Sequence, residues 1–327
     1  MKEMKKDAVE KKSTKGSSGT EVLENSNKWK IDFVGKRRIF MSISLVLIVI
    51  SLISMFTKGF NFGLEFLGGS EIVVETTSSD LTVADVRAKL SNIAPEFENA
   101  RILKIQSIGQ SSKNTFSIVV TPRDEKRTLR TYTADEKADL AQKVESSLNG
   151  KVVTFNEVSG DAANEMKNLT WKAVVFTLLA MLVYIAIRFK FVFGVGAVLA
   201  LIHDVIITAG MFSLFGIEMN VSAIAAFLTL AGYSVNDTIV IFDRIKEFGR
   251  KYKGKDMKIV VNDSINSTLT RTINTALTTF FTVLMLLLFA TGSIKSFGFG
   301  MSIGVVIGTY SSMFIASPVV IRWAKSM

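Results

Sequence analysis

Six long apolar segments constrain this chain more than any other feature of its 327 residues. Each segment approaches the roughly 20 residues that an α-helix needs to cross a bilayer. A mean hydropathy of +0.35 is too high for an ordinary soluble protein of this size. We therefore expect an α-helical multi-pass membrane protein with six transmembrane helices. The predicted spans are 39–57, 171–188, 191–215, 220–243, 273–291 and 297–321.

Basic residues set the predicted orientation of these spans. Cytoplasmic connections carry an excess of Lys and Arg, and residues 243–271 hold eight Lys or Arg against four Asp or Glu. Arg188 and Lys190 mark a second basic connection, whereas the connection 216–220 contains no Lys or Arg. We therefore expect a plasma-membrane protein with both termini in the cytoplasm and an external segment between the first two spans.

The net charge of +10 does not indicate nucleic-acid binding. Residues 58–170 hold fourteen Lys or Arg against sixteen Asp or Glu, so the excess basic charge lies in short segments beside the spans. That distribution favours membrane topology and contact with lipid over contact with nucleic acid.

The predicted organisation has four parts. Residues 1–35 form a polar, disordered cytoplasmic tail, because they have almost nothing to bury. Residues 36–57 form the first transmembrane helix, which the absence of a small-residue cleavage site marks as an uncleaved anchor. Residues 58–168 form an external domain. Residues 169–327 contain transmembrane helices 2–6 with a basic cytoplasmic loop at 244–271.

The external segment has the pattern of a ferredoxin-like α+β domain. Alternating apolar residues predict strands, and apolar residues at helical spacing predict two helices between them. The order β-α-β-β-α-β is the ferredoxin-like order, which identifies a fold and no function. The predicted strands are 69–76, 101–108, 115–120 and 151–158, and the predicted helices are 82–92 and 134–148.

The scarcity of metal-binding and reactive side chains excludes several classes of site. The chain has no cysteine and one histidine, so disulfides, thiolate metal sites and multi-histidine metal sites are excluded. No Walker motif is present to bind a nucleotide. We therefore expect no cofactor, no metal and no catalytic residue.

The most informative polar residue is Asp237 in the fourth span. It lies next to Asn236 and about 9 Å along the helix from Asp243, where the chain becomes openly charged. A carboxylate at that depth is costly unless it is neutral, paired or hydrated. Asp237 could bind and release a proton during transport, or it could be a hydrogen-bonded group that joins helices.

Arg271 is the candidate partner of Asp237. Counting back about 20 residues from Thr291 places it near the cytoplasmic end of the fifth span. Its long side chain could reach inward to Asp237, or it could extend outward to the lipid headgroups.

His203 and Asp204 lie near the midpoint of the third span. Adjacent positions on a helix do not face each other, so we do not expect the two side chains to form a ready-made pair. Each could join helices by hydrogen bonds or take part in a secondary proton relay, and the same two roles are open to Asn236 in the fourth span.

Small residues predict close helix packing in two spans. Gly300, Gly304 and Gly308 recur at a spacing of four, which lets helix backbones approach each other. Gly232 in the fourth span has the same interpretation.

Five sequence elements together resemble the SecF family of the bacterial and archaeal protein-export machinery. "GLEFLGGS" (63–70) is similar to the family's glycine-rich element through Gly63, Glu65, Gly68 and Gly69, with Glu65 where the family usually has Asp. The other four are the pair His203-Asp204, "GYSVNDTIVIFDRIKE" (232–247), "TLTRTINTALTTF" (268–280) and "FGFGMSIGVVIGTYSS" (297–312).

The resemblance implies a function and partners. Members of the family pair with SecD and resemble the resistance-nodulation-division superfamily of proton-driven transporters. The pair associates with the SecYEG channel, with YajC and YidC as further expected partners, and uses the proton-motive force to help preproteins cross the membrane. The family's relay residues correspond to Asp237 and Arg271. The expected role is that of an accessory transport subunit and not an enzyme.

Three alternatives compete with this hypothesis. A small-molecule efflux half-transporter of the same superfamily would need a pocket that six spans and one small domain hardly provide. A structural assembly factor of the translocon would need no proton transfer. An intramembrane aspartyl protease would need Asp204 and Asp237 together, but their predicted depths differ by roughly 10 Å.

Overall fold

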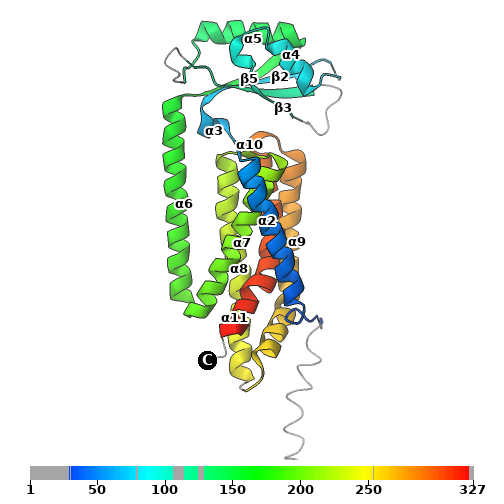
Figure 1. Ribbon diagram of the computed structural model, residues 1–327, viewed down its shortest axis with the longest axis vertical. Helices are drawn as coiled ribbons and strands as arrows, with labels where there is room; N and C mark the ends of the chain where they lie inside the picture. Colours follow the sequence, from blue (N-terminus) through cyan, green and yellow to red (C-terminus); the bar gives the residue numbers. More distant parts are fainter. Residues whose placement is uncertain are drawn as a thin grey trace, which may run out of the picture.

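The computed structural model describes residue 29 and residues 31–78, 80–105, 114–123, 129–252 and 254–323. The molecule is elongated, with a small α/β domain at one end of a bundle of long helices (Figure 1). Most of the predicted tail at 1–35 lies outside the described residues, as do the final residues of the predicted strand 101–108. The end of the tail differs from the prediction, because Phe33 and Val34 are buried against the helical bundle.

The small domain confirms the predicted β-α-β-β-α-β order. Its sheet is antiparallel, with the strand order β3-β4-β2-β5, and the two helices pack on one face (Figure 1). The strands are β2 (Gly69–Thr76), β3 (Arg101–Ile105), β4 (Asn114–Val120) and β5 (Gly150–Val158), and the helices are α4 (Val83–Leu90) and α5 (Ala134–Leu148). A short 3₁₀ turn, Pro95–Phe97, follows α4.

Local sequence signals explain where the two domain helices begin. The side chains of Thr82 and Thr133 each accept a hydrogen bond from the backbone N–H three residues later, and the carboxylates of Asp85 and Glu136 accept one from the backbone N–H of the cap residue. Alternate residues of the strands and one stripe of each helix then bury a common apolar core. The core includes Ile72, Val74, Val86, Leu90, Phe97, Phe116, Ile118, Val144 and Leu148, all fully buried.

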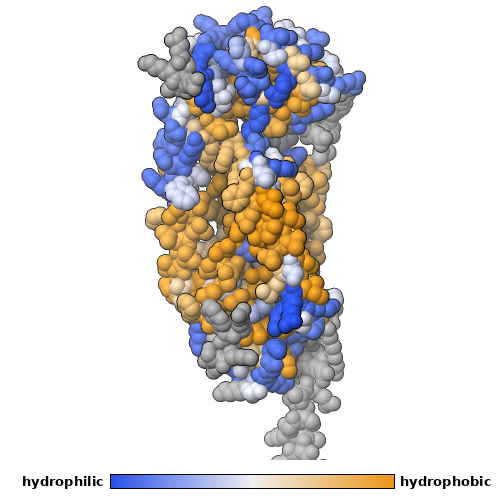
Figure 2. All heavy atoms as spheres, viewed as in Figure 1, coloured by the Kyte–Doolittle hydropathy of each residue, from blue (hydrophilic) through white to orange (hydrophobic). Residues whose placement is uncertain are grey.

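Within the described residues, six helices are long and apolar enough to cross a membrane, which confirms the predicted number of spans. Their outward-facing residues form an apolar belt, and hydrophilic residues lie above and below it (Figure 2). The spans are α2 (Arg37–Thr57), α6 (Gly160–Arg188), α7 (Phe191–Phe215), α8 (Val221–Lys251), α9 (Met257–Phe289) and α10 (Gly292–Ser311), which continues through a π-helical turn (Ser312–Ala316) into α11 (Ser317–Trp323).

Three helices extend beyond the predicted apolar segments. α6 begins at Gly160, eleven residues before the predicted span, and Ser159 caps it. The predicted loop 244–271 is mostly helical, since α8 runs to Lys251 and α9 begins at Met257. Apolar residues at helical spacing in this region, such as Ile245 and Ile265, are buried against the rest of the bundle and so stabilise helix outside the apolar segments.

Burial divides the spans into two groups. About half of the apolar window of α7, α8 and the α10–α11 unit is buried inside the chain, against 6% for α6 and 11% for α9. In Figure 1, α6 stands apart from the other spans and runs directly into the external domain.

Two short elements join the external domain to the bundle. The strand β1 (Asn61–Phe62) pairs in parallel with β6 (Glu218–Met219), which lies between α7 and α8. The single-turn helix α3 (Leu64–Leu67) follows β1 and leads into the first strand of the domain.

Candidate functional site

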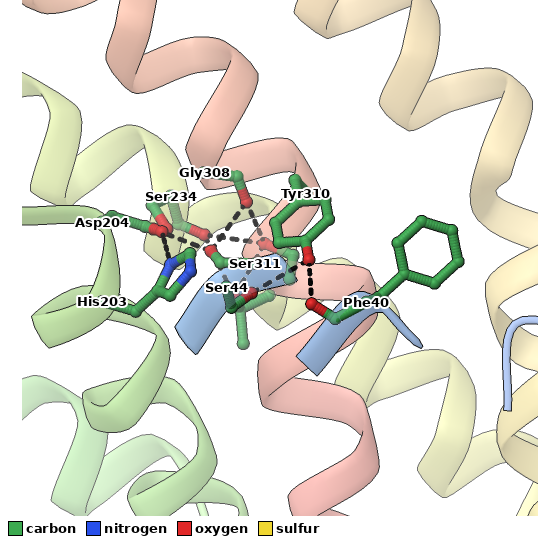
Figure 3. Close-up of polar contacts among 10 residues, drawn as sticks. Phe40, Ser44, His203, Asp204, Ser234, Gly308, Tyr310 and Ser311 are labelled. Carbon is green, nitrogen blue, oxygen red and sulfur yellow. Dashed lines mark hydrogen bonds and ion pairs between the residues drawn. The ribbon is translucent and has the colours of Figure 1, made fainter. Parts of the chain in front are cut away.

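A hydrogen-bond network around Asp204 lies in the middle of the helical bundle (Figure 3). Asp204 is fully buried, and its Oδ2 accepts hydrogen bonds from Ser234 Oγ at 2.5 Å and Ser311 Oγ at 2.8 Å. Its Oδ1 lies 2.9 Å from Nδ1 of His203. The three partners come from α7, α8 and α10, so one carboxyl group joins three helices.

The network continues to a fourth helix through Tyr310. The His203 and Tyr310 rings stack with their centroids 6.0 Å apart. The Tyr310 hydroxyl donates to the backbone oxygen of Phe40 at 2.5 Å and lies 2.9 Å from Ser44 Oγ. Both of these residues belong to α2, as Figure 3 shows. The buried Nε2 of His203 has no hydrogen-bond partner among the described residues.

The expectation that His203 and Asp204 do not form a pair is therefore wrong. Adjacent positions differ by about 100° around a helix, but the imidazole extends far enough to reach the neighbouring carboxyl group. The hydroxyl groups of α8 and α10 hold Asp204 on the side from which the ring of His203 can contact it.

Asp237 lies in a different environment from Asp204. It is 4% exposed, near the midpoint of α8, and its Oδ2 has no hydrogen-bond partner among the described residues. Arg271 is the charged group that interacts with it electrostatically. The two side chains form no direct ion pair in the described structure. Arg271 is therefore close enough to act on Asp237 electrostatically, but it does not contact it.

Further polar side chains that the sequence analysis did not single out lie around Asp237. Tyr233 is one helical turn before it, and the hydroxyl groups of Thr279 and Thr309 lie near that of Tyr233. The buried oxygens of Tyr233 and Thr309 have no hydrogen bond within the described residues. Buried polar atoms are rarely left without a partner, so this region has capacity to bind water or a partner side chain.

The same stretch of α8 carries Asp237 and contacts Asp204. Ser234 donates to Asp204, and the Thr238 hydroxyl both donates to the Ser234 backbone oxygen at 3.1 Å and bonds Ser312 Oγ at 3.0 Å. Ser312 begins the π-helical turn that follows α10. Turns of this kind occur often at functional sites, because the extra residue redirects side chains.

Arg271 is part of an exposed polar stripe on α9. Asn274 and Thr278 follow it at helical spacing, and all three are exposed within this chain. Asn236, next to Asp237 on α8, is exposed as well. Polar groups on the outside of a membrane-spanning helix are costly in lipid, so these positions are suited to contact with another protein.

The glycines of α10 pack closely, as their spacing predicted. A Cβ at Gly300 would lie 3.0 Å from Ala226, one at Gly304 would lie 2.6 Å from Leu230, and one at Gly308 would lie 3.1 Å from Ser234. Gly232 differs, because no atom of the described residues lies within 4 Å of its Cβ position. The predicted close packing of Gly232 against another helix is therefore absent among the described residues.

The glycine-rich element 63–70 forms the junction between the bundle and the external domain. Gly68 and Gly69 have φ angles of 71° and 119°, and a Cβ at Gly69 would lie 2.4 Å from the Val120 oxygen. A glycine is required at such a position because other residues would be strained and would collide with β4. A Cβ at Gly63 would likewise meet carboxylate oxygens of Glu65 and Glu218 at 2.6 Å and 2.8 Å.

Arg101 connects the external domain to this junction. It reaches from β3 to form an ion pair with Glu218 at 3.4 Å, and it donates to the backbone oxygen of Phe62 at 2.6 Å and to the side chain of Asn61. Burial raises the pKa of Glu218, and the nearby Arg101 opposes that shift.

No group of three or more potential ligands that could hold a metal ion occurs within the part of the chain that the structure describes.

Two family models match the chain. The model of the SecD/SecF GG motif matches residues 53–80, which contain the glycine-rich element. The model of the C-terminal part of the protein export membrane proteins SecD/SecF matches residues 136–326.

Similar proteins and structures agree with these matches. The protein translocase subunit SecF of Petrotoga mobilis is 49% identical over 298 residues, which cover 90% of this chain and 96% of that protein. The protein of the same name from Calditerrivibrio nitroreducens is 39% identical over 92% of this chain and 95% of its own length.

Among solved structures, SecDF of Thermus thermophilus, a translocon-associated membrane protein, superimposes with a TM-score of 0.79 at 29% identity. The match covers 92% of this chain and 39% of that one. SecDF in the super-membrane-facing form gives a TM-score of 0.61 at 30% identity, again covering 39% of the longer chain. This chain therefore spans about two fifths of the length of the SecDF chains that it matches.

Proposed function

The chain belongs to the SecF family of protein export membrane proteins, and on this premise we propose that it uses the proton-motive force to assist preprotein translocation through SecYEG. Membership of a family of translocase subunits supports a role in protein translocation. The proton-coupled part of the proposal depends on the site around Asp237.

The state of Asp237 is the observation that carries the proposal. Oδ2 of its buried carboxyl group has no hydrogen-bond partner among the described residues, and the cation Arg271 lies near it without a direct ion pair. A carboxyl group that no hydrogen bond fixes in one protonation state can bind or release a proton with little rearrangement of its neighbours. Asp204 differs, because three hydrogen-bond partners would have to rearrange when its protonation state changes.

The proposed cycle begins when a proton from the external side reaches Asp237 along polar groups near Tyr233. Protonation removes the negative charge and with it the attraction to Arg271, so α8 and α9 can shift. One charge that crosses 100 mV contributes about 2.3 kcal/mol, which is enough to bias an equilibrium between two helix arrangements.

Two connections could carry such a shift to the external domain. α6 is continuous from the membrane to the end of β5, and Arg101 ties β3 to the β1–β6 pair. A movement of α8 would act on β6, which directly precedes it. We propose that the external domain then alternately holds and releases the emerging polypeptide.

A SecD-like chain is the proposed partner in the membrane. The exposed polar stripe of α9, which begins at Arg271, needs a protein surface. The SecDF structures contain more than twice the length of this chain, which leaves room for a second half. Contacts with SecYEG, YajC and YidC extend the same proposal. The family and the six spans support a multi-pass plasma-membrane protein, and the positive-inside rule supports cytoplasmic termini and an external position for 58–168.

The proposal is tested with Asp237→Asn, which keeps the shape of the side chain and removes its titration. Preprotein translocation into inverted vesicles is measured with and without a proton gradient, with the chain and a SecD partner co-expressed. We expect the gradient to stimulate translocation in the wild type and to have no effect in the variant, at equal protein levels.

Asp243→Asn is the matched control. It makes the same chemical change on the same helix, but at a side chain that is 43% exposed and stands at the last position of the predicted apolar segment. Its translocation should keep responding to the gradient. If Asp237→Asn responds as well as the wild type does, Asp237 only joins helices, and a structural assembly factor becomes the better explanation.

A further inference from the structure

A groove with basic walls lies where two helix connections meet at the end of the bundle opposite the external domain. One wall is the turn between α6 and α7, and the other is the turn between α8 and α9; Figure 1 shows both turns at this end. The groove has a volume of about 960 Å³. This size is within the range of small-molecule sites in proteins.

The charge of the groove is strongly unbalanced. Five cationic side chains line it, against one carboxylate, Asp256. Asp256 already caps α9 by accepting a hydrogen bond from the Lys258 backbone. The five cations are Arg188, Lys190, Lys246, Arg250 and Lys255.

Part of this positive charge has no counterion in the described structure. Asp243, beside the groove, pairs with Arg188 and with Lys246. Lys190 and Arg250 form no ion pair with a described residue, and Lys255 has only a longer-range interaction with the carboxyl group of Asp263. Three cations of like sign in one groove repel each other, so an anion that binds among them is stabilised.

The floor of the groove is apolar and holds two of the cations. Phe189 and Phe193 are 6% and 4% exposed, and Lys246 Nζ lies 4.3 Å and 5.3 Å from their ring centroids. Lys255 Nζ lies 4.9 Å from the ring centroid of Tyr252. These contacts keep the ammonium groups next to apolar surface and partly away from water.

Two exposed apolar side chains lie at the edge of the groove, Ile187 in its lining and Phe191 beside it. Ile187 and Phe191 flank the basic turn and are 82% and 78% exposed, which is suited to contact with acyl chains. A phosphate beside Lys190 would lie at the depth of the lipid headgroups, because this turn joins two spans. A soluble anion would gain from the basic groups but not from this apolar rim.

We propose that the groove binds the headgroup of an anionic phospholipid, with Lys190, Arg250 and Lys255 around the phosphate and the acyl chains against Ile187 and Phe191. Basic pockets between membrane helices on the cytoplasmic side bind anionic headgroups for the same reasons. The bound lipid would bridge the α6–α7 and α8–α9 connections.

The test is native mass spectrometry of the full-length chain from membranes of mixed phosphatidylglycerol and phosphatidylcholine. We expect the wild type to retain phosphatidylglycerol selectively. The triple variant Lys190→Gln, Arg250→Gln, Lys255→Gln should lose about tenfold of that selectivity, because each basic group near the membrane surface contributes to attraction of anionic lipid.

The control variant makes the same charge change outside the groove, beside α2 and the start of α9, with Lys36→Gln, Arg38→Gln and Lys258→Gln. It should retain the lipid as the wild type does. Equal losses in the two triple variants would mean that the attraction is diffuse and would overturn the proposal.

A second variant distinguishes a lipid from a soluble anion. Ile187→Ser with Phe191→Ser removes the apolar rim and keeps every cation of the groove. Retention of phosphatidylglycerol should fall in this variant. Unchanged retention, or complete displacement of the lipid from the wild type by millimolar inorganic phosphate, would contradict a lipid site.

Discussion

Asp204 and Asp237 are the same residue type on neighbouring helices, and both are buried in the bundle, but their surroundings differ. Asp204 has three hydrogen-bond partners from three positions, whereas Asp237 Oδ2 has none within the described residues. A carboxyl group with all its partners in place joins helices and resists change. One without them is unstable by itself and responds to a proton or to a partner chain. The difference assigns stability to the first site and the proposed proton coupling to the second.

The largest expected effect on this comparison comes from truncating each carboxyl group. Asp204→Ala removes three hydrogen bonds and leaves buried hydroxyl groups without a partner, so the free energy of unfolding should fall by about 2–3 kcal/mol. Asp237→Ala should change it by less than about 0.5 kcal/mol, because no hydrogen bond to Oδ2 is lost. Thermal unfolding of the purified chain in detergent measures both, and equal losses would erase the distinction.

A change at Arg271 should have the next largest effect. We expect it to alter the response of translocation to a proton gradient and not the free energy of unfolding. Arg271→Gln removes the cation near Asp237, so stimulation of translocation by a proton gradient should fall by about tenfold, which corresponds to about 1.4 kcal/mol of electrostatic interaction. Arg271→Lys should keep most of the stimulation, since no bidentate contact with Asp237 is present to lose. The same vesicle assay measures both variants. A Lys variant as defective as the Gln variant would indicate that the shape of the guanidinium matters and not its charge alone.

The sequence predicted most of the fold because its signals are local. Apolar length defined the spans, alternation defined the strands, and the helix 134–148 and the strand 69–76 have the predicted bounds. Near 160 and 250 the helices extend beyond the predicted spans, because buried residues on one face stabilise helix outside the apolar window.

The polar network around Asp204 was predictable only in part. Whether His203 contacts Asp204 depends on which hydroxyl groups other helices supply, and Tyr310 comes from more than a hundred residues away. One signal was present in α2, whose buried residues are Ser44, Ser51 and Ser54, at a spacing that places them on one face. Small polar residues on one face of an otherwise apolar span indicate the side that packs on other helices.

A glycine beside the network should give a smaller effect. A Cβ at Gly308 would lie 3.1 Å from the Cβ of Ser234, which donates to Asp204. Gly308→Ala should therefore displace that hydroxyl and lower the free energy of unfolding by about 1 kcal/mol. Gly232→Ala is the control, with open space around it and a gain of up to about 1 kcal/mol in helix propensity. Thermal unfolding measures the stability of both variants. Similar changes in the free energy of unfolding would show that α10 can shift without weakening the hydrogen bonds of Asp204.

The smallest expected effect extends the comparison to Glu218, a carboxyl group outside the membrane that has one cation beside it. Burial raises its pKa above the ordinary 4.5, while Arg101 opposes and Glu65 and Glu71 reinforce the shift. The folded chain then holds a proton that the unfolded chain releases, so this contribution to stability is full below about pH 4.5 and is lost as the pH rises through the folded-state pKa.

Glu218→Gln cannot titrate, so its unfolding temperature relative to that of the wild type should increase between about pH 4.5 and about pH 7. The raised pKa of Glu218 already includes the opposing effect of Arg101, so the ion pair that the variant loses reduces the size of this increase but does not reverse its sign. A relative unfolding temperature that falls across the same interval would mean that Arg101 outweighs burial. Glu218 would then behave as an ordinary ion-paired carboxylate, and Asp237 would be left as the one carboxyl group of the three whose environment favours a change of protonation.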